Sequence, residues 1–414
     1  MTKSRICIRK ALNCWAGLTV LFWASLSSVQ AETPSPSIVI DVASGKVLHS
    51  EYASNPWYPA SITKLMTLYV ALQEVQAGRA KMDQLLTMSA TAAKLPPSKM
   101  GFKPGTKVRL DNALVIIMVK SANDVAAMIA ENLGGSEKGF AAKMNQAARD
   151  LGMQESHFVN AHGLPNKRQV VSARDMAILA RAILLEFPEH ANLFQIGAIR
   201  FGKKVMKNHN GLIGRYPGAT GMKTGFICSS GFNLVSSAKQ NGRQVLAVVL
   251  GAPSARERNN KAAELLNKGF SSFGVFTTTL DAWPSNAGTE PPDLRSEICK
   301  KNVVPLSDDD TSAPLSGSAA DSGNPLSTIQ AQAYAPPEDH PSLAPVAKAF
   351  TPVVVWTGLY PPGTKAPKGS DETNQKVHSA EDGGLGYFAP LPPLRPSRLS
   401  WYQQETDMEP LQLR

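Results

Sequence analysis

The sequence predicts a mixed α/β domain whose sheet is assembled from segments that lie far apart in the chain. Apolar and polar residues follow the two-residue period of β-strands at 37–50 and in three stretches after residue 220. Between these regions, apolar residues recur at the spacing of amphipathic helices. Strands at both ends and helices in the middle are most simply combined as one sheet covered by helices.

The individual elements follow from local signals. Residues 37–50 predict a hairpin that turns at Ser44-Gly45-Lys46. The helix predicted at 172–186 is capped by Ser172 and is followed by Pro188. Further helices are expected at 61–78, 110–119, 124–133, 137–151 and 256–269, a loop or irregular strand at 94–107, and strands at 223–227, 231–237 and 244–250.

A chain of 414 residues with 43% hydrophobic residues is long enough for two or three domains and at least one sizeable core. Its first 31 residues have the pattern of a secretory signal peptide, with basic residues, an apolar run at 15–26 and the small-residue end Val29-Gln30-Ala31. The run is too short for a comfortable transmembrane helix. We therefore expect cleavage after Ala31 and export to the periplasm or another extracytoplasmic space.

Cys228 and Cys299 are the two cysteines that remain once the leader is removed. In an oxidising compartment they either form one disulfide or stay as two unpaired, small, buried residues. The sequence does not show whether their Cα atoms come within bonding range. No cysteine pair has the short spacing of a zinc site and the seven His are scattered, so we expect no metal and no cofactor.

Charge is unevenly distributed along the chain. Residues 32–280 contain 29 Lys and Arg against 16 Asp and Glu, whereas residues 281–414 contain 10 against 17. A basic body can indicate nucleic-acid binding, but the sequence has no nucleic-acid motif and no arginine run, so we expect no such partner. The basic body is then either an ordinary solvated surface or one that meets anionic cell-wall polymers.

The composition changes at about residue 281. Nineteen of the 30 prolines lie in residues 281–414, and a segment of this kind buries too little apolar surface to fold well. We therefore expect a folded domain over 32–280 and a largely disordered tail over 281–414. Two apolar islands, 353–360 and Tyr387-Phe388, are candidates to dock on the body or on a partner. The last 20 residues contain two prolines and turn acidic, so no membrane anchor is predicted and membrane association stays open.

Ser61 and Lys64 form the pair that is most suggestive of chemistry. Ser61 falls on the first turn of the helix predicted at 61–78, and residues three apart share a helix face, so the Lys64 amine can reach the Ser61 hydroxyl. A neutral lysine can act as the base for a serine nucleophile, but with a reference pKa of about 10.4 the neutral form costs about 4 to 5 kcal/mol at pH 7. Burial or a nearby cation must lower that pKa. The same pattern recurs at Ser236 and Lys239, so the pair alone is a weak signal.

Two further triplets supply the partners that the pair needs. Ser121-Ala122-Asn123 lies in a predicted turn between two helices, and Lys223-Thr224-Gly225 opens a predicted strand. In this order the three motifs resemble the S-x-x-K, S-D-N and K-T-G signature of the serine penicillin-recognising enzymes. Ala122 is the one departure from the signature, at a position whose side chain takes no part in the chemistry.

Within that superfamily, the sequence is most similar to the low-molecular-mass penicillin-binding proteins that are D-alanyl-D-alanine carboxypeptidases, serine peptidases of family S11. The resemblance covers about residues 36–275. It implies the β-lactamase/transpeptidase-like fold, an antiparallel sheet of about five strands with helices on both faces. The supporting segments are 60–66, 120–124, 160–164, 221–225, 231–235 and 251–254 with Arg258.

The resemblance also implies roles for individual residues. Ser61 would attack the carbonyl of the penultimate D-alanine of a peptidoglycan stem peptide, with Lys64 as general base. Ser121 would bridge the two motif lysines and relay a proton to the leaving amine. Asn123 would hold the substrate backbone amide, although an interhelical cap is the competing role for this triplet. His162 is expected to be a structural hydrogen-bonding residue, because Lys64 already fills the role of base.

The third motif and its surroundings would bind the substrate. Lys223 and Thr224 would receive the terminal carboxylate, and Gly225 beside them is also expected to be substrate-binding. The main-chain N–H groups of Ser61 and Phe226 would form the oxyanion hole. Phe226 stands where some relatives carry a polar residue. A further residue, Arg258, either adds charge to the carboxylate site or is an exposed helix arginine. β-Lactam antibiotics are expected to acylate the same serine.

The sequence distinguishes three other functions from this one to different degrees. A class A β-lactamase needs a deacylating Glu in a Glu-x-x-Leu-Asn segment between the second and third motifs, and the nearest match, Glu264 to Asn267, follows the third. A D,D-endopeptidase of the same family, which cuts cross-links instead of releasing terminal D-alanine, is poorly distinguished by sequence. A cell-wall-binding or β-lactam-sensing protein that is acylated without turnover is disfavoured, because all three motifs are intact.

Overall fold

The structure is a computed structural model. It describes residues 35–272, 278–286, 289–299, 341–345, 350–361 and 363. The expected signal peptide and the island Tyr387-Phe388 lie outside these residues. Across the described ranges, no helix combines the length and the apolar character needed to cross a bilayer.

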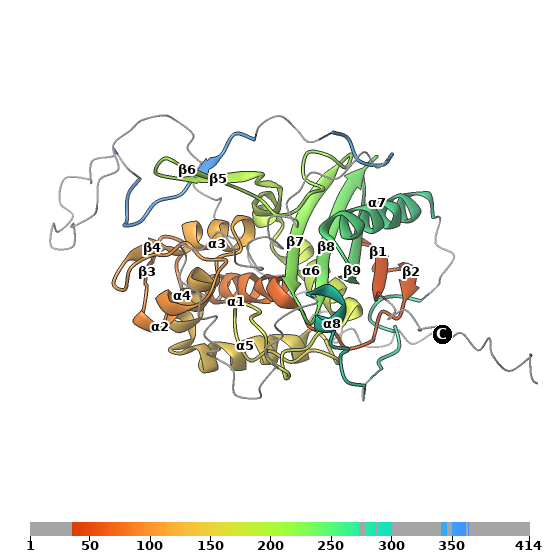
Figure 1. Ribbon diagram of the computed structural model, residues 1–414, viewed down its shortest axis with the longest axis horizontal. Helices are drawn as coiled ribbons and strands as arrows, with labels where there is room; N and C mark the ends of the chain where they lie inside the picture. Colours follow the sequence, from red (N-terminus) through yellow and green to blue (C-terminus); the bar gives the residue numbers. More distant parts are fainter. Residues whose placement is uncertain are drawn as a thin grey trace, which may run out of the picture. The chain divides into compact units, whose positions relative to one another are not determined.

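A five-stranded antiparallel sheet with strand order β2-β1-β9-β8-β7 is the centre of the fold (Figure 1). Strand β1, from the start of the domain, pairs with β9, from its far end, and β7 is an edge strand. The prediction of one sheet assembled from distant segments is therefore confirmed. The strands are β1 (Ser37–Asp41), β2 (Val47–Glu51), β7 (Ala219–Ile227), β8 (Gly231–Gln240) and β9 (Arg243–Ala252).

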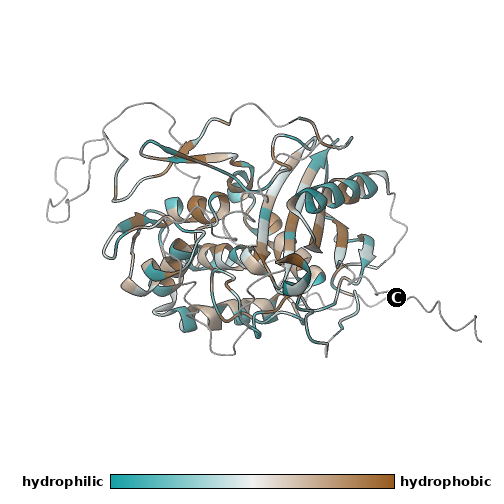
Figure 2. Cartoon of the chain, viewed as in Figure 1, coloured by the Kyte–Doolittle hydropathy of each residue, from teal (hydrophilic) through white to brown (hydrophobic). Residues whose placement is uncertain are grey.

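Helices cover both faces of this sheet, as expected. Successive strand residues point to opposite faces, so β9 is apolar on both sides. One set of its residues packs with α7 (Ala255–Ser271), and the other packs with α6 (Ala173–Glu186) and the remaining helices. Figure 2 shows that the side of α7 facing the viewer is mostly hydrophilic. The two sets are Val245, Ala247 and Val249, and Leu246, Val248 and Leu250.

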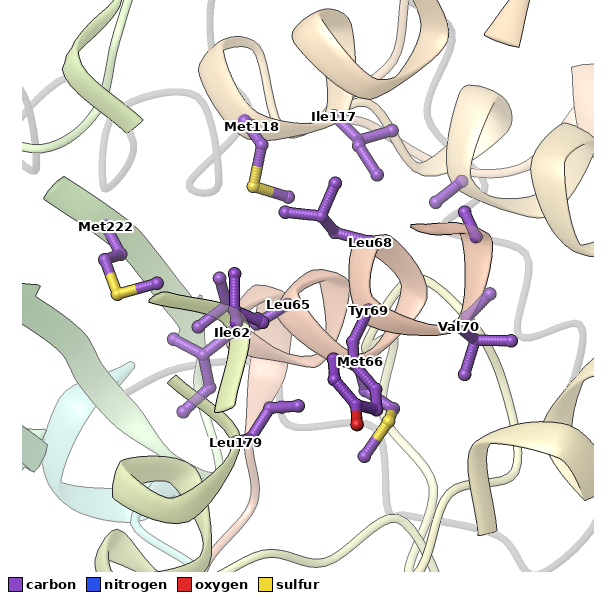
Figure 3. Close-up of a cluster of buried hydrophobic side chains, with 14 of the residues drawn as sticks. Ile62, Leu65, Met66, Leu68, Tyr69, Val70, Ile117, Met118, Leu179 and Met222 are labelled. Carbon is purple, nitrogen blue, oxygen red and sulfur yellow. The ribbon is translucent and has the colours of Figure 1, made fainter. Parts of the chain in front are cut away.

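Helix α1 (Lys64–Gln76) lies inside the helical part of the domain. Ten of its 13 residues are buried, because it is apolar around most of its circumference and other helices enclose it (Figure 3). Its start is a 3₁₀ turn, η1 (Ala60–Thr63), which corrects the single helix expected at 61–78. The helices that pack around α1 include α3 (Leu110–Val119), α4 (Asn123–Gly134) and α5 (Glu137–Asp150).

Serine caps fix the starts of the predicted helices α5, α6 and α7. The Ser172 side chain accepts a hydrogen bond from the Asp175 N–H, which confirms the predicted cap of α6. Ser136 and Ser254 do the same for α5 and α7. The predicted helices therefore agree with the observed ones to within about two residues at these starts.

Several short elements carry too few residues for a periodic signal, and the sequence did not predict them. They form two small sheets and short helical turns. The loop expected at 94–107 is loop over 95–106. The unpredicted elements are β3 (Leu85–Thr87), α2 (Ala90–Lys94), β4 (Lys107–Arg109), η2 (Pro188–Gln195), β5 (Ala198–Phe201) and β6 (Lys204–Lys207).

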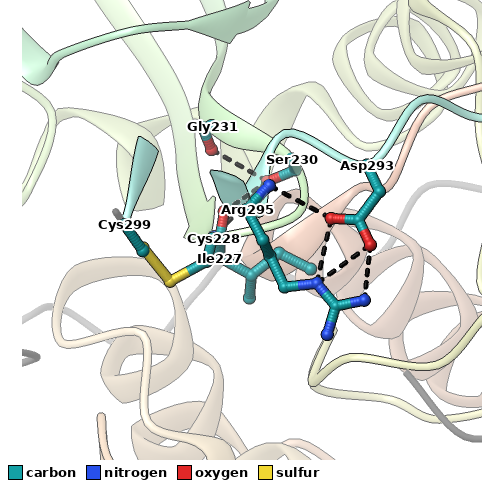
Figure 4. The surroundings of a disulfide bond; sticks show 7 residues. All are labelled: Ile227, Cys228, Ser230, Gly231, Asp293, Arg295 and Cys299. Atoms are coloured by element: carbon teal, nitrogen blue, oxygen red, sulfur yellow. Dashed lines mark hydrogen bonds and ion pairs between the residues drawn. A yellow bond between two sulfur atoms is a disulfide. The ribbon is translucent and has the colours of Figure 1, made fainter. Parts of the chain in front are cut away.

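Cys228 and Cys299 form a disulfide (Figure 4), so the first of the two alternatives left open by the sequence holds. The bond joins the turn after β7 to the short helix α8 (Arg295–Ile298), and the Leu294 N–H donates to the Ser229 carbonyl at 3.1 Å beside it. Closing a loop of 71 residues restricts the unfolded chain and stabilises the fold by about 4 kcal/mol in the chain-entropy view. A segment beyond residue 280 is thus attached to the strand that carries Lys223.

The apolar island near the C-terminus docks on the body. We call residues 350–360 the C-terminal strap. Its strand β10 (Val353–Val354) pairs in parallel with β5, and the Val355 N–H donates to the Arg200 carbonyl at 2.9 Å. Further along, the Gly358 N–H donates to the Lys107 carbonyl at 2.7 Å. The strap therefore ties the β5–β6 hairpin to the β3–β4 pair. The domain boundary expected at residue 280 stays a prediction, and the strap shows that contacts with the body continue beyond it.

Removing the C-terminal strap should destabilise the domain. We expect a chain that ends at residue 345 to lose about 2 to 4 kcal/mol of unfolding free energy relative to one that ends at residue 363, because Val355 is buried and β10 supplies pairing to β5. Urea denaturation of the two chains, both with the disulfide intact, measures the difference. Equal midpoints for the two chains would contradict this account of the strap.

Candidate active site

Ser61 lies at the point where η1 meets the edge strand β7. It is the one residue of η1 that is not buried, so its hydroxyl is accessible while its neighbours anchor the turn. Strand β7 passes so close that a Cβ added at Gly225 would lie 2.8 Å from the Pro59 carbonyl oxygen and 3.0 Å from the Ser61 nitrogen. Only glycine allows this approach of two backbones. The expected place of Gly225 in the site is therefore explained by packing.

The Lys64 amine is fully buried and touches three oxygens. Its Nζ lies 2.9 Å from Ser61 Oγ, 2.8 Å from Asn123 Oδ1 and 2.6 Å from the His162 carbonyl oxygen. The amide and carbonyl oxygens can only accept hydrogen bonds, whereas the Ser61 hydroxyl can also donate. A neutral amine with its two N–H groups on Asn123 and His162 therefore directs its lone pair at the Ser61 hydroxyl.

Burial is the main cause that lowers the pKa of Lys64 well below its ordinary value, and the positive charge of Lys223 lowers it further. The carboxylate of Asp124 opposes this shift. Asp124 accepts hydrogen bonds from the Met100 and Gly101 N–H groups, so its carboxylate binds the backbone of the loop at 95–106. Both conditions for a basic lysine, burial and a nearby cation, are met.

Lys223 reaches the site from β7. Its Nζ lies 2.9 Å from Ser121 Oγ and 2.9 Å from the Thr224 carbonyl oxygen. Burial and the charge of Arg258 lower the pKa of Lys223 to about 7. Ser121 was expected to bridge both lysines. It contacts Lys223, whereas the hydrogen bonds of Lys64 go to Ser61, Asn123 and His162, so only the Lys223 half of that bridge is present.

Asn123 is the first residue of α4 and makes no cap for it. Its Oδ1 accepts from Lys64, its Nδ2 donates to the Pro96 carbonyl at 3.0 Å, and its main-chain N–H donates to the Ser98 carbonyl at 2.7 Å. The capping role is therefore not realised. The side-chain amide has two N–H groups, and these contacts use one of them. The second can donate to the substrate amide that Asn123 is expected to hold.

The remaining predicted residues surround the third motif. Arg258, in the first turn of α7, is 4% exposed, so the alternative of an exposed helix arginine is wrong. Its guanidinium donates to Asn259 Oδ1, and its charge acts on Lys223. Thr224 is buried beside Lys223, and the Phe226 ring stacks on Phe232 at a centroid separation of 4.2 Å, which leaves a flat apolar side chain beside the site.

Comparison with known proteins agrees with the motif order. The family model described as D-alanyl-D-alanine carboxypeptidase, peptidase family S11, matches residues 24–254. The chain belongs to this family. Its relatives include the D-alanyl-D-alanine carboxypeptidase DacC of Escherichia coli, 34% identical over 277 residues, or 63% of this chain and 69% of the relative. DacF of Bacillus subtilis is 32% identical over 60% of this chain and 64% of the relative.

Solved structures of the family show the same fold. The D-alanyl-D-alanine carboxypeptidase DacD of Francisella tularensis superposes with a TM-score of 0.57 at 29% identity, covering 58% of this chain and 71% of that one. Penicillin-binding protein D2 of Listeria monocytogenes, in an ampicillin-bound form, gives 0.52 at 26% identity over 57% of this chain and 97% of that one. The expected fold class, a penicillin-binding protein fold with a five-stranded antiparallel sheet, is confirmed.

Some groups in the site carry no signal in the sequence. The His162 carbonyl holds Lys64 and the Pro96 carbonyl holds Asn123, but a main-chain oxygen leaves no mark on residue type. His209 is a further group, since burial first and then the charges of Lys223 and other cations hold its pKa well below the usual histidine value. Among the described residues, no set of three or more His, Cys, Asp or Glu is placed to hold a metal ion.

The two lysines predict a bell-shaped dependence of D-alanine release on pH. Activity should rise as Lys64 loses its proton and fall as Lys223 loses its own, with the alkaline limb of kcat/KM near pH 7. Because Arg258 lowers the pKa of Lys223, Arg258→Gln should move this limb to higher pH, and Arg258→Lys should leave it in place. Steady-state rates on a D-Ala-D-Ala peptide between pH 5 and 10 measure the limb. An alkaline limb that stays in place in Arg258→Gln would contradict the assignment to Lys223.

Proposed function

We propose that this family S11 protein is an exported D,D-carboxypeptidase that removes the terminal D-alanine from peptidoglycan stem pentapeptides through an ester on Ser61. The observation that carries the proposal is the hydrogen bonding of the Lys64 amine. Of its three contacts, only the Ser61 hydroxyl can donate a hydrogen bond to the lone pair of the neutral amine. The names of the relatives support the reaction, and the order of the motifs supports the residues.

In the acylation step, the Ser61 oxygen attacks the carbonyl carbon of the penultimate D-alanine and its proton passes to Lys64 Nζ. The negative charge that develops on the carbonyl oxygen is received by the main-chain N–H groups of Ser61 and Phe226. The C–N bond then breaks, the leaving amine takes up the proton that Lys64 accepted from Ser61, with Ser121 as the proposed relay, and D-alanine departs. An ester between Ser61 and the shortened peptide remains.

In the deacylation step, a water molecule attacks the ester carbonyl and Lys64 accepts the proton of that water. The ester C–O bond breaks, the proton returns to the Ser61 oxygen, and the shortened peptide leaves. Each group ends the cycle in its starting state. No cofactor is required by this scheme, because the base, the nucleophile and the electrostatic groups all belong to the chain.

The positive charges behind Ser61 favour a substrate with a free C-terminus. Lys223, buried beside Thr224, and the nearby charge of Arg258 would pair with the terminal carboxylate of the peptide. That carboxylate would in turn keep Lys223 protonated. β-Lactams carry a carboxylate in a similar place relative to a reactive amide, so we propose that they acylate Ser61 as well. The ampicillin-bound relative supports this part of the proposal.

We also propose that residues 1–31 direct export and that residues 32–280 form the catalytic domain, with 281–414 as its tail. The basic and apolar pattern of the leader supports the first part. Peptidoglycan is assembled outside the cytoplasm, and the relatives are enzymes of that polymer, which supports an extracytoplasmic site of action.

Two reactions of the full-length protein test the function. Incubation with a fluorescent penicillin should label the chain covalently, and incubation with a D-Ala-D-Ala pentapeptide should release D-alanine. Both should fall by at least about 1,000-fold in Ser61→Ala, because the nucleophile is removed. Ser236→Ala is the matched control, since Ser236 belongs to the second Ser-x-x-Lys pattern but donates to the Ala247 carbonyl inside the sheet.

Three outcomes would overturn parts of this proposal. Release of D-alanine by Ser61→Ala would exclude Ser61 as the nucleophile. Faster cleavage of cross-linked peptide dimers than of pentapeptide would make the protein a D,D-endopeptidase. Covalent labelling without any turnover of peptide would make it a β-lactam-binding protein.

A further inference from the structure

The loop at residues 160–164 forms the floor beneath Lys64. Its Ala161 carbonyl accepts from Thr67 Oγ1 at 2.6 Å, one turn along α1 from the Lys64 contact with His162. Gly163 packs directly under η1, where an added Cβ would lie 1.9 Å from the Ala60 carbonyl oxygen. The loop is thus fitted against the helix that carries both Ser61 and Lys64.

The His162 ring is held in one orientation on the far side of this loop. Its Nδ1 accepts a hydrogen bond from the Leu164 N–H at 3.1 Å, and its Nε2 lies 3.0 Å from Glu137 Oε1. An Nδ1 that accepts an N–H carries no proton, so the neutral ring has its proton on Nε2 and donates it to Glu137. The His162 side chain is 3% exposed and cannot exchange this partner for bulk water.

Glu137 reaches the ring from the first turn of α5. Burial alone would raise the pKa of Glu137, but the hydrogen bond and the interaction with His162 outweigh burial and keep that pKa below its ordinary value. The same carboxylate also accepts from the Ala161 N–H at 3.4 Å. One carboxylate therefore holds both the ring and the backbone of the loop.

We infer that Glu137 and His162 are positioning residues that hold the His162 carbonyl against the Lys64 amine and so direct the amine's lone pair at Ser61. The inference rests on the proposed function and concerns the same site. The side chains of Glu137 and His162 bond to each other and to the loop backbone and not to Ser61, so their effect passes through the loop. The sequence placed His162 in a segment that supports the family resemblance and predicted only a structural hydrogen-bonding role for it.

The direction of the lone pair depends on the number of acceptors around the amine. With Asn123 and the His162 carbonyl both in place, the two N–H groups of neutral Lys64 are occupied and the lone pair faces Ser61. If the carbonyl moves away, one N–H turns to the Ser61 oxygen, and the lone pair no longer meets the hydroxyl proton. The amine is still close to Ser61, but it is oriented as a donor and not as a base.

The same change predicts a shift in pH dependence. A protonated amine needs three acceptors, so loss of one acceptor destabilises the charged form and lowers the pKa of Lys64. The acid limb of acylation should therefore move to lower pH while the plateau rate falls. The other charged groups that act on Lys64 are Lys223 on β7 and Asp124 on α4, with His209 close enough to feel its charge, and the variants tested leave all three in place.

The test measures the second-order rate of acylation by a fluorescent penicillin as a function of pH in the full-length protein. Glu137→Ala and His162→Ala should lower the plateau by about 10- to 100-fold, a part of the roughly 10²- to 10⁴-fold that a general base supplies. For pentapeptide, kcat should fall with little change in KM. Glu137→Gln, which retains an acceptor oxygen, and His162→Gln, which retains an N–H donor, should recover most of the rate.

Glu74→Ala is the matched control. Glu74 is on the same helix as Lys64 and holds Arg79 and Lys143 at 3.0 and 3.1 Å, so this variant removes an equally well paired carboxylate away from Ser61. It should acylate at the wild-type rate. Because His162→Ala removes a buried ring, the fraction of folded protein is counted by the total label bound, and rates are expressed per labelled site.

Two results would overturn the inference. One is a wild-type rate and an unmoved acid limb in folded Glu137→Ala. The other is a lower plateau with an unmoved limb and no recovery in Glu137→Gln, which would indicate general loosening of the loop. Failure of the proposed function would look different, because the wild-type protein would then not be labelled at all or Ser61→Ala would be labelled equally.

Discussion

The site depends on keeping a lysine amine neutral beside a serine hydroxyl. Lys64 is surrounded by protein on all sides, and the charge of Lys223 adds to the effect of burial. Burial and charge set the pKa of the amine but do not orient it. Orientation comes from two oxygens that can only accept, Asn123 Oδ1 and the His162 carbonyl, which leave Ser61 as the partner of the lone pair. Electrostatics sets the protonation state, and hydrogen-bond chemistry sets the direction.

The fold explains how such distant residues meet at one point. The buried helix α1 presents Lys64 from inside the core, and the edge strand β7 presents Lys223. The turn between α3 and α4 presents Ser121, and the first residue of α4 is Asn123. β7 approaches η1 closely because Gly225 has no side chain. The disulfide and the strap fasten segments beyond residue 280 to this frame.

Long periodic elements and ordered motifs were predictable from the sequence. The sheet, the helices that cover it and the Ser172 cap needed only period and capping signals. The place of helices on both faces was implied by the family resemblance, and the three motifs located Ser61, Ser121 and Lys223. The short strands β5 and β6 were not predictable, because four residues carry little periodicity. The two carbonyls that orient Lys64 and Asn123 were invisible for a different reason, since backbone oxygens are identical at every residue. The disulfide needed a distance, which only the fold provides.

The central claim is that Lys64 is a neutral amine in the resting protein. NMR of protein labelled with ¹³C and ¹⁵N in its lysines follows the titration of each side-chain amine, and the Lys64 signal is identified by its absence in Lys64→Arg. This signal should titrate well below the ordinary lysine range. A Lys64 amine that titrates near the reference value of about 10.4 would contradict the claim, because the base would then be protonated at neutral pH.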